Sequence, residues 1–126
     1  MSWQCHYRRV ALRVLVVDDH PGFRRLARLL LAAGGYAVVG EAADGGSALA
    51  QAALLRPDVV LLDVMLPDLD GFAVAERLAI LPAHPLVVLV SGRTRTELGR
   101  RLDTAPVRGF LAKDQLTLEA FAALTG

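Results

Sequence analysis

Five short apolar runs alternate with five segments of helical periodicity, and this alternation limits the fold more than any other feature of the chain. The apolar runs are residues 13–17, 36–40, 59–62, 86–90 and 109–112. The helical segments are Pro21 to the Gly34-Gly35 pair, Ser47 to Leu55, Phe72 to Pro82, Thr94 to Leu102, and Leu116 to Leu124. Runs that are apolar throughout are typical of strands buried on both faces of a parallel sheet.

Strands that alternate with helices indicate right-handed crossovers and a sheet covered by helices on both sides. We therefore expect an α/β, flavodoxin-like doubly wound (βα)5 fold with a five-stranded parallel sheet in the order 2-1-3-4-5. The helix from Thr94 to Leu102 should be the loosest, because it has few apolar residues and Gly99 costs it about 1 kcal/mol relative to alanine.

Length and composition set the class of protein. The chain has 126 residues, of which 54% are apolar, and its 14 basic and 13 acidic residues nearly cancel. These values indicate one folded domain and exclude an intrinsically disordered chain. We expect a flexible N-terminal arm at residues 1–12 and a single domain at residues 13–126, with no output domain in this chain.

Cysteine content and hydropathy indicate the compartment. Cys5 is the single cysteine, so the chain cannot form an internal disulfide or a paired Cys/His zinc site. No apolar run reaches the roughly 18 residues of a membrane span, and the N-terminus lacks the apolar core of a signal peptide. We therefore expect a soluble cytoplasmic protein with no membrane partner.

Four of the five predicted strands end on polar side chains. Asp18 and Asp19 follow the first run, Asp63 the third, Ser91 the fourth and Lys113 the fifth. Because parallel strands place their carboxyl ends at one edge of the sheet, these groups should meet there. Three clustered carboxylates repel one another unless a cation is present, and oxygen ligands with open positions suit Mg²⁺. This edge is predicted to be a magnesium site where a phosphoryl group can be stabilised.

Each of these features alone has a simpler interpretation. An Asp-Asp pair is more typical of a turn or helix cap, and an isolated lysine of a solvated face. Taken together, the placements favour a site. In addition, 13 of the 14 cations are arginines, and the only lysine is Lys113. Lysine offers a compact ammonium where arginine has a bulkier planar fork.

Four motifs resemble the receiver domain of two-component response regulators, and most closely the receivers of NarL/LuxR type. They read Val-Leu-Val-Val-Asp-Asp-His-Pro-Gly-Phe-Arg, Val-Val-Leu-Leu-Asp-Val-Met-Leu-Pro-Asp-Leu-Asp-Gly, Val-Ser-Gly and Gly-Phe-Leu-Ala-Lys-Asp. The resemblance extends from about Arg13 to the last helix. It implies a signalling domain and not an enzyme with a separate substrate, although the domain supports its own phosphotransfer and autodephosphorylation.

The resemblance also implies roles for individual residues. Asp63 would be the phosphoacceptor for a phosphoryl group from a sensor histidine kinase or a phosphotransfer protein. Asp18, Asp19 and Asp63, with the backbone carbonyl of Met65, would bind Mg²⁺. The implied phosphate-binding and switch residues are Ser91, Gly92 and Lys113, with Phe110 as the switch aromatic. The surface formed by the fourth strand, fourth helix and fifth strand would then change conformation to control a partner or output.

Other functions compete with this interpretation. A flavodoxin-like cofactor binder needs a phosphate-cradling loop after the first strand, where Asp18 and Asp19 would repel the phosphate. An aspartate-nucleophile phosphatase needs an acidic residue where Met65 stands. A receiver-like docking module that works without phosphorylation stays as the alternative. We expect no direct nucleic-acid binding by this domain. The sequence is compatible with a homodimer and does not decide the oligomeric state.

Overall fold

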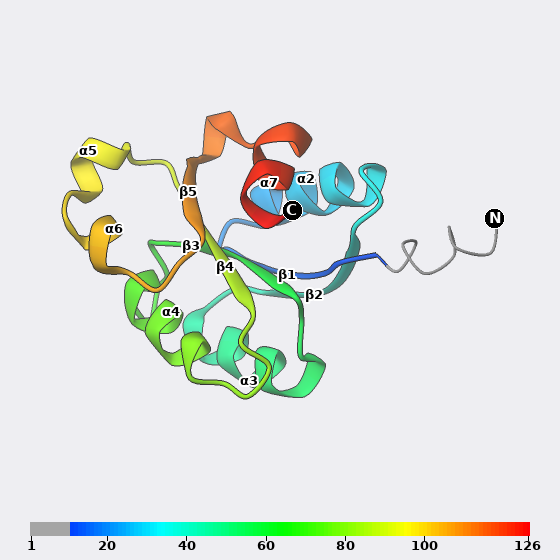
Figure 1. The fold of residues 1–126 in the computed structure, drawn as a ribbon, viewed down its shortest axis with the longest axis horizontal. Coiled ribbons are helices and arrows are strands. Elements are labelled where there is room, and N and C mark those ends of the chain that lie inside the picture. The colour runs from blue at the N-terminus through cyan, green and yellow to red at the C-terminus, as the bar shows by residue number, and fades with distance from the viewer. Residues whose placement is uncertain (1–10) are drawn as a thin grey trace, which may run out of the picture.

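The computed structural model describes residues 11–126 and contains one five-stranded parallel sheet (Figure 1). The strand order is β2-β1-β3-β4-β5, so the predicted topology is confirmed. The strands are β1 (Arg13–Val17), β2 (Ala37–Ala42), β3 (Val59–Asp63), β4 (Leu86–Ser91) and β5 (Gly109–Ala112). All four neighbouring pairs are parallel. The order reverses between β1 and β3, which places a crevice beyond their carboxyl ends.

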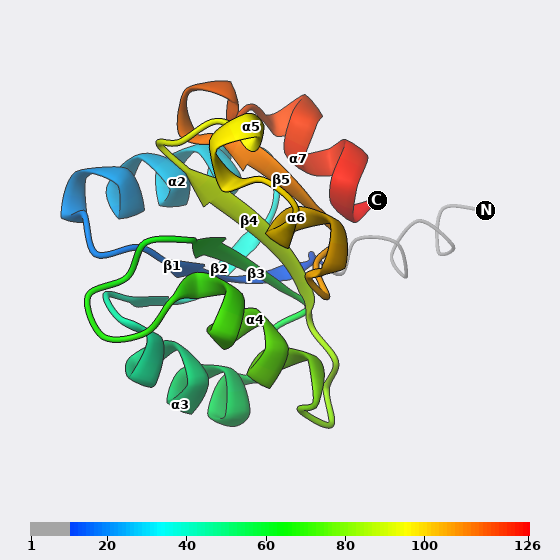
Figure 2. The same cartoon turned by 90° about the vertical axis from the view of Figure 1, so that its left-hand side faces the viewer.

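Helices cover both faces of this sheet (Figure 2). One face carries α2 (Pro21–Ala33) and α7 (Leu118–Thr125). Their buried Ala27, Leu31 and Phe121 pack against the strand side chains that point to this face. The other carries α3 (Gly45–Leu55) and α4 (Gly71–Ala79). Every residue of β3 is buried, which explains why its sequence is apolar without alternation.

The predicted helix from Thr94 to Leu102 is wrong as a continuous element. The structure has two single turns, α5 (Arg95–Leu98) and α6 (Arg101–Thr104). Thr94 and Glu97 form a capping box that starts α5, and Gly99 ends it with a φ of 67°. Glycine reaches that left-handed region without strain, whereas a helix cannot continue through it. The segment has one buried side chain, Leu102, to hold it on the core.

The last predicted helix, from Leu116 to Leu124, also begins later in the structure than the sequence predicts. The segment Lys113–Gln115 forms a 3-10 turn, η1, and α7 begins at Leu118 because the Thr117 hydroxyl accepts from the Ala120 N–H. Most of the flexible arm predicted at residues 1–12 lies outside the described residues. Within residues 11–126, we find no helix of the length and apolar character that crossing a bilayer requires.

Candidate functional site

The carboxyl edge of the sheet gathers side chains from four strands around one open cleft of about 550 Å³. The residues that line this cleft are His20, Phe23, Asp63, Met65, Ser91, Gly92, Arg93 and Lys113. Asp18 directly follows β1, is fully buried, and lies 2.5 Å from Nζ of Lys113, one of the lining residues. The fold thus brings together groups that the sequence separates by up to 95 positions between Asp18 and Lys113.

Asp63 ends β3 and is only 2% exposed. Burial, followed by the nearby Asp18 carboxylate, raises the pKa of Asp63 from 3.8 to about 6. Two contacts partly oppose this rise: the Met65 N–H donates to Asp63 Oδ1 at 3.2 Å, and Lys113 Nζ donates to Oδ2 at 3.4 Å. The protein therefore holds a carboxylate at some cost in free energy, which a bound cation would relieve.

Lys113 is the cation nearest to both buried acids. Its Nζ lies 2.5 Å from Asp18 Oδ2 and 3.4 Å from Asp63 Oδ2, and the side chain is 20% exposed. The Asp18 contact is an ion pair and not a well-directed hydrogen bond, because Asp18 Oδ2 has no hydrogen-bond partner. The ammonium also lies 4.6 Å from the centre of the Phe23 ring, which helps to hold it in the cleft.

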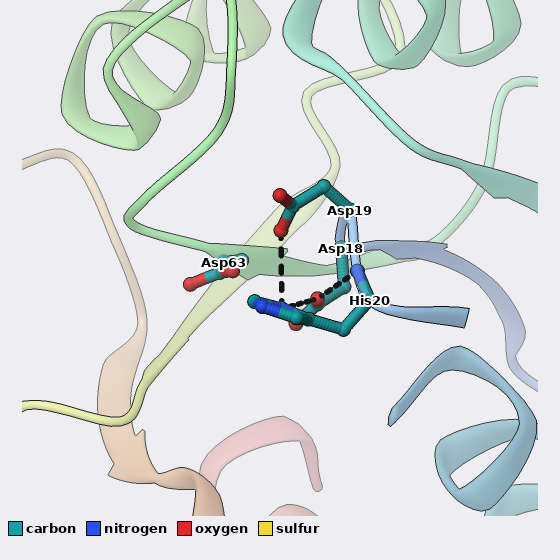
Figure 3. A group of neighbouring side chains, drawn as sticks. All are labelled: Asp18, Asp19, His20 and Asp63. Atoms are coloured by element: carbon teal, nitrogen blue, oxygen red, sulfur yellow. Dashed lines mark hydrogen bonds and ion pairs between the residues drawn. The ribbon is translucent and has the colours of Figure 1, made fainter. Parts of the chain in front are cut away.

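Sequence reasoning assigned no role to His20, which the structure places inside the acidic cluster (Figure 3). Its Nδ1 lies 2.9 Å from Asp18 Oδ1 and 3.1 Å from Asp19 Oδ1. Lys113 Nζ is 3.5 Å from the same nitrogen. The signal was its position directly after the Asp-Asp pair, in a turn too short to carry the side chain away from the sheet edge.

The donor set fits a divalent metal. One ligand atom from each of Asp18, Asp19, His20 and Asp63 lies within 4.8 Å of the others. Three of these are carboxylates, and the two buried ones, Asp18 and Asp63, share the ammonium of Lys113, whose Nζ lies 2.5 Å and 3.4 Å from their Oδ2 atoms. Carboxylate oxygens that leave open positions suit Mg²⁺. Met65 lines the cleft, and its backbone N–H donates to Asp63 Oδ1. The role of its backbone carbonyl as a metal ligand stays a prediction.

The remaining predicted residues occupy different positions relative to the cleft. Ser91 is fully buried at the end of β4, and its Oγ accepts from the Arg93 N–H at 3.0 Å. Gly92 is exposed, and no atom lies within 4 Å of where its Cβ would stand. Phe110 does not line the cleft: it is buried in the core, with the Arg95 guanidinium 5.6 Å from its ring centre.

Comparison with known proteins points to one family. A family model described as the response regulator receiver domain matches residues 14–124. The NarL transcriptional regulatory protein of Mycobacterium tuberculosis is 37% identical over 114 residues, which cover 90% of this chain and 53% of that protein. Protein-glutamate methylesterase/protein-glutamine glutaminase 6 of Anaeromyxobacter dehalogenans is 43% identical over 113 residues, covering 83% of this chain and 32% of that protein.

A solved structure is similar over almost the whole chain. The signal receiver domain of NarL from Mycobacterium tuberculosis has a TM-score of 0.79 and 34% identity, covering 92% of this chain and 98% of that one. This chain spans about half the length of several curated relatives that it matches. The similarity therefore concerns the receiver portion of those longer proteins.

Proposed function

Because this chain belongs to the response regulator receiver domain family, we propose that Asp63 accepts a phosphoryl group from a sensor histidine kinase or phosphotransfer protein. The observation that carries the proposal is the position of Asp63, buried at the end of β3 yet lining an open cleft beside Lys113. Aspartyl phosphates are among the covalent intermediates that carboxylates form in enzymes.

The transfer exchanges one bond for another. An Asp63 carboxylate oxygen attacks the phosphorus, and the bond between phosphorus and the donor histidine nitrogen breaks, leaving the imidazole with the electron pair. Ser91 ends β4, the strand next to β3, and Lys113 follows β5 with its Nζ 3.4 Å from Asp63 Oδ2, so a hydroxyl and an ammonium can stabilise the phosphoryl oxygens. A bound Mg²⁺, held by Asp18, Asp19, Asp63 and the Met65 carbonyl, would neutralise charge on the phosphoryl group. Later hydrolysis of the acyl phosphate returns Asp63 to its carboxylate form.

Ser91 offers a route from the phosphoryl group to the surface. Its Oγ now accepts from the Arg93 N–H, two residues before the capped start of α5. A phosphoryl group on Asp63 would draw the Ser91 hydroxyl and compete with this contact. The α5–α6 segment, with its single buried side chain, is the element that should respond most easily. The β4, α5–α6 and β5 surface would then act on a partner or output.

This switching hypothesis has a direct spectroscopic test. Beryllofluoride with Mg²⁺, a stable phosphoryl mimic, should shift the amide NMR signals of residues 91–111. Lys113→Arg should weaken that response, because a planar guanidinium does not reproduce the compact ammonium. Arg77→Lys, a cation exchange on the exposed face of α4, is the matched control and should respond like the parent. A full response in Lys113→Arg would show that Lys113 does not couple the site to the surface.

Helix α2 offers a docking face for the phosphoryl donor. Leu26 and Leu29 are 58% and 57% exposed, and Arg25 is exposed beside them. The helix begins one residue after His20, so a partner that packs on this face would reach the cleft. Leu26→Ser with Leu29→Ser should slow transfer from a cognate kinase and leave labelling by acetyl phosphate unchanged. Equal loss with both donors would point to damage of the site instead.

Intact-mass spectrometry tests phosphorylation itself. With acetyl phosphate and Mg²⁺, the protein should gain one phosphoryl group, and chelation of the metal should prevent it. Asp63→Asn should gain none, whereas Asp114→Asn, which removes an exposed carboxylate, should react like the parent. A parent protein that never gains the group but still binds its partner would favour the alternative, a docking module independent of phosphorylation. We also propose a cytoplasmic location and no direct DNA binding by this domain.

A further inference from the structure

The turn between β1 and α2 fixes the imidazole of His20 over the acidic cluster. Only Asp18, Asp19 and His20 separate the last residue of β1 from Pro21, the first residue of α2. The His20 N–H donates to Asp18 Oδ1 at 2.8 Å, and the ring Nδ1 contacts the same oxygen at 2.9 Å. The backbone and the side chain are therefore tied to one buried carboxylate.

The position of Nδ1 matches that of a metal ligand. It lies 2.9 Å from Asp18 Oδ1 and 3.1 Å from Asp19 Oδ1, and one ring nitrogen of His20 is within 4.8 Å of a carboxylate oxygen of each of Asp18, Asp19 and Asp63. Metal–ligand bonds of about 2.0–2.2 Å place opposite ligands up to about 4.4 Å apart, so small side-chain movements would suffice. The cluster joins the buried Asp18 and Asp63 carboxylates to Asp19 and this imidazole, and the two buried acids share the single ammonium of Lys113, so the donor set is one that attracts a cation.

An imidazole nitrogen changes which cation such a site prefers. Mg²⁺ favours oxygen ligands and near-ideal octahedral geometry, whereas imidazole binds borderline transition ions such as Co²⁺ and Zn²⁺. We propose that His20 is a nitrogen ligand that shifts the selectivity of this site from Mg²⁺ toward these transition ions. This inference rests on the proposed divalent-metal site and adds a ligand to it.

The test uses the full chain with Co²⁺ and Mg²⁺ as probes, without a phosphoryl donor. Calorimetric titration should show that His20→Gln weakens Co²⁺ binding by about tenfold or more and changes Mg²⁺ binding far less. His84→Gln is the matched control, because His84 precedes β4 and thus stands at the opposite end of the sheet. In the Co²⁺ complex, NMR should also show a strongly shifted, solvent-exchangeable imidazole proton that His20→Gln removes and His84→Gln retains.

The outcomes separate this inference from the proposed function. If both ions bind and His20→Gln leaves their affinity ratio unchanged, His20 is not a ligand, while the metal site and phosphoacceptor proposal stand. If neither ion binds the parent protein, both the ligand inference and the metal site are overturned. Selective loss of Co²⁺ affinity together with loss of the shifted proton supports the ligand.

Discussion

Replacing Asp63 with asparagine should stabilise the metal-free protein at neutral pH. The folded-state pKa of Asp63 is raised from 3.8 to about 6, chiefly by burial and then by the Asp18 carboxylate. The folded state therefore binds a proton more tightly than the unfolded chain. As pH rises from about 4 to about 6, the folded state loses stability, and the full cost is present above that range.

The magnitude follows from the size of the pKa change. A rise from 3.8 to about 6 corresponds to about 3 kcal/mol, because each unit of pKa difference between the folded and unfolded states is worth about 1.36 kcal/mol. Asparagine removes the buried charge but also removes the ion pair with Lys113 and turns an amide toward that ammonium. We therefore expect a net gain of about 1–3 kcal/mol in the free energy of unfolding at pH 7.5.

Urea denaturation in the presence of a chelator measures this gain at pH 7.5 and at pH 4. The difference between Asp63→Asn and the parent should shrink toward zero at the lower pH, where the parent carboxyl is protonated in the fold. Asp114→Asn removes an exposed carboxylate and should stay within about 0.5 kcal/mol of the parent at both pH values. A gain that is absent at pH 7.5, or equal at both pH values, would refute the electrostatic argument.

Three further substitutions probe the frame around the site. Gly71→Ala should cost at least about 1–3 kcal/mol in urea denaturation, because the new Cβ would lie 2.5 Å from the Asp63 carbonyl oxygen; parent-like stability would contradict this packing. Phe121→Ala, in the fully buried core, should cost about 3–5 kcal/mol, and a loss below 1 kcal/mol would disagree with its burial. Arg101→Met removes the ion pair with Asp70 and should change the free energy of unfolding by less than about 1 kcal/mol. Amide hydrogen exchange in α5–α6 should become faster, and unchanged exchange would show that this ion pair does not restrain the segment.

The order of elements was predictable because burial on both faces leaves a strong signal. All residues of β3, and all but the first of β1 and β4, are buried, so their apolar runs stand out in the sequence. The break of the 94–102 helix was not predicted. Gly99 has no side chain to exclude a helix, and its left-handed conformation depends on how the flanking turns pack.

The candidate site was predictable for a different reason. Parallel strands place their ends at one edge, so Asp18, Asp63 and Lys113 could be grouped from sequence position alone. Distances within the group could not be predicted, since they depend on strand register and side-chain direction. His20 was missed because its neighbour Pro21 marks a helix start, which gave the histidine a sufficient structural explanation.

Chemical trapping of the modified residue tests the central claim most directly. An aspartyl phosphate is an activated acyl group, and borohydride reduces it to the alcohol, which converts that aspartate into homoserine. After treatment with acetyl phosphate and Mg²⁺, peptide mass mapping should find homoserine at position 63 and at no other aspartate. Homoserine at Asp18 or Asp19 instead, or a phosphorylated protein whose Asp63 is unchanged, would contradict the assignment of Asp63 as the phosphoacceptor.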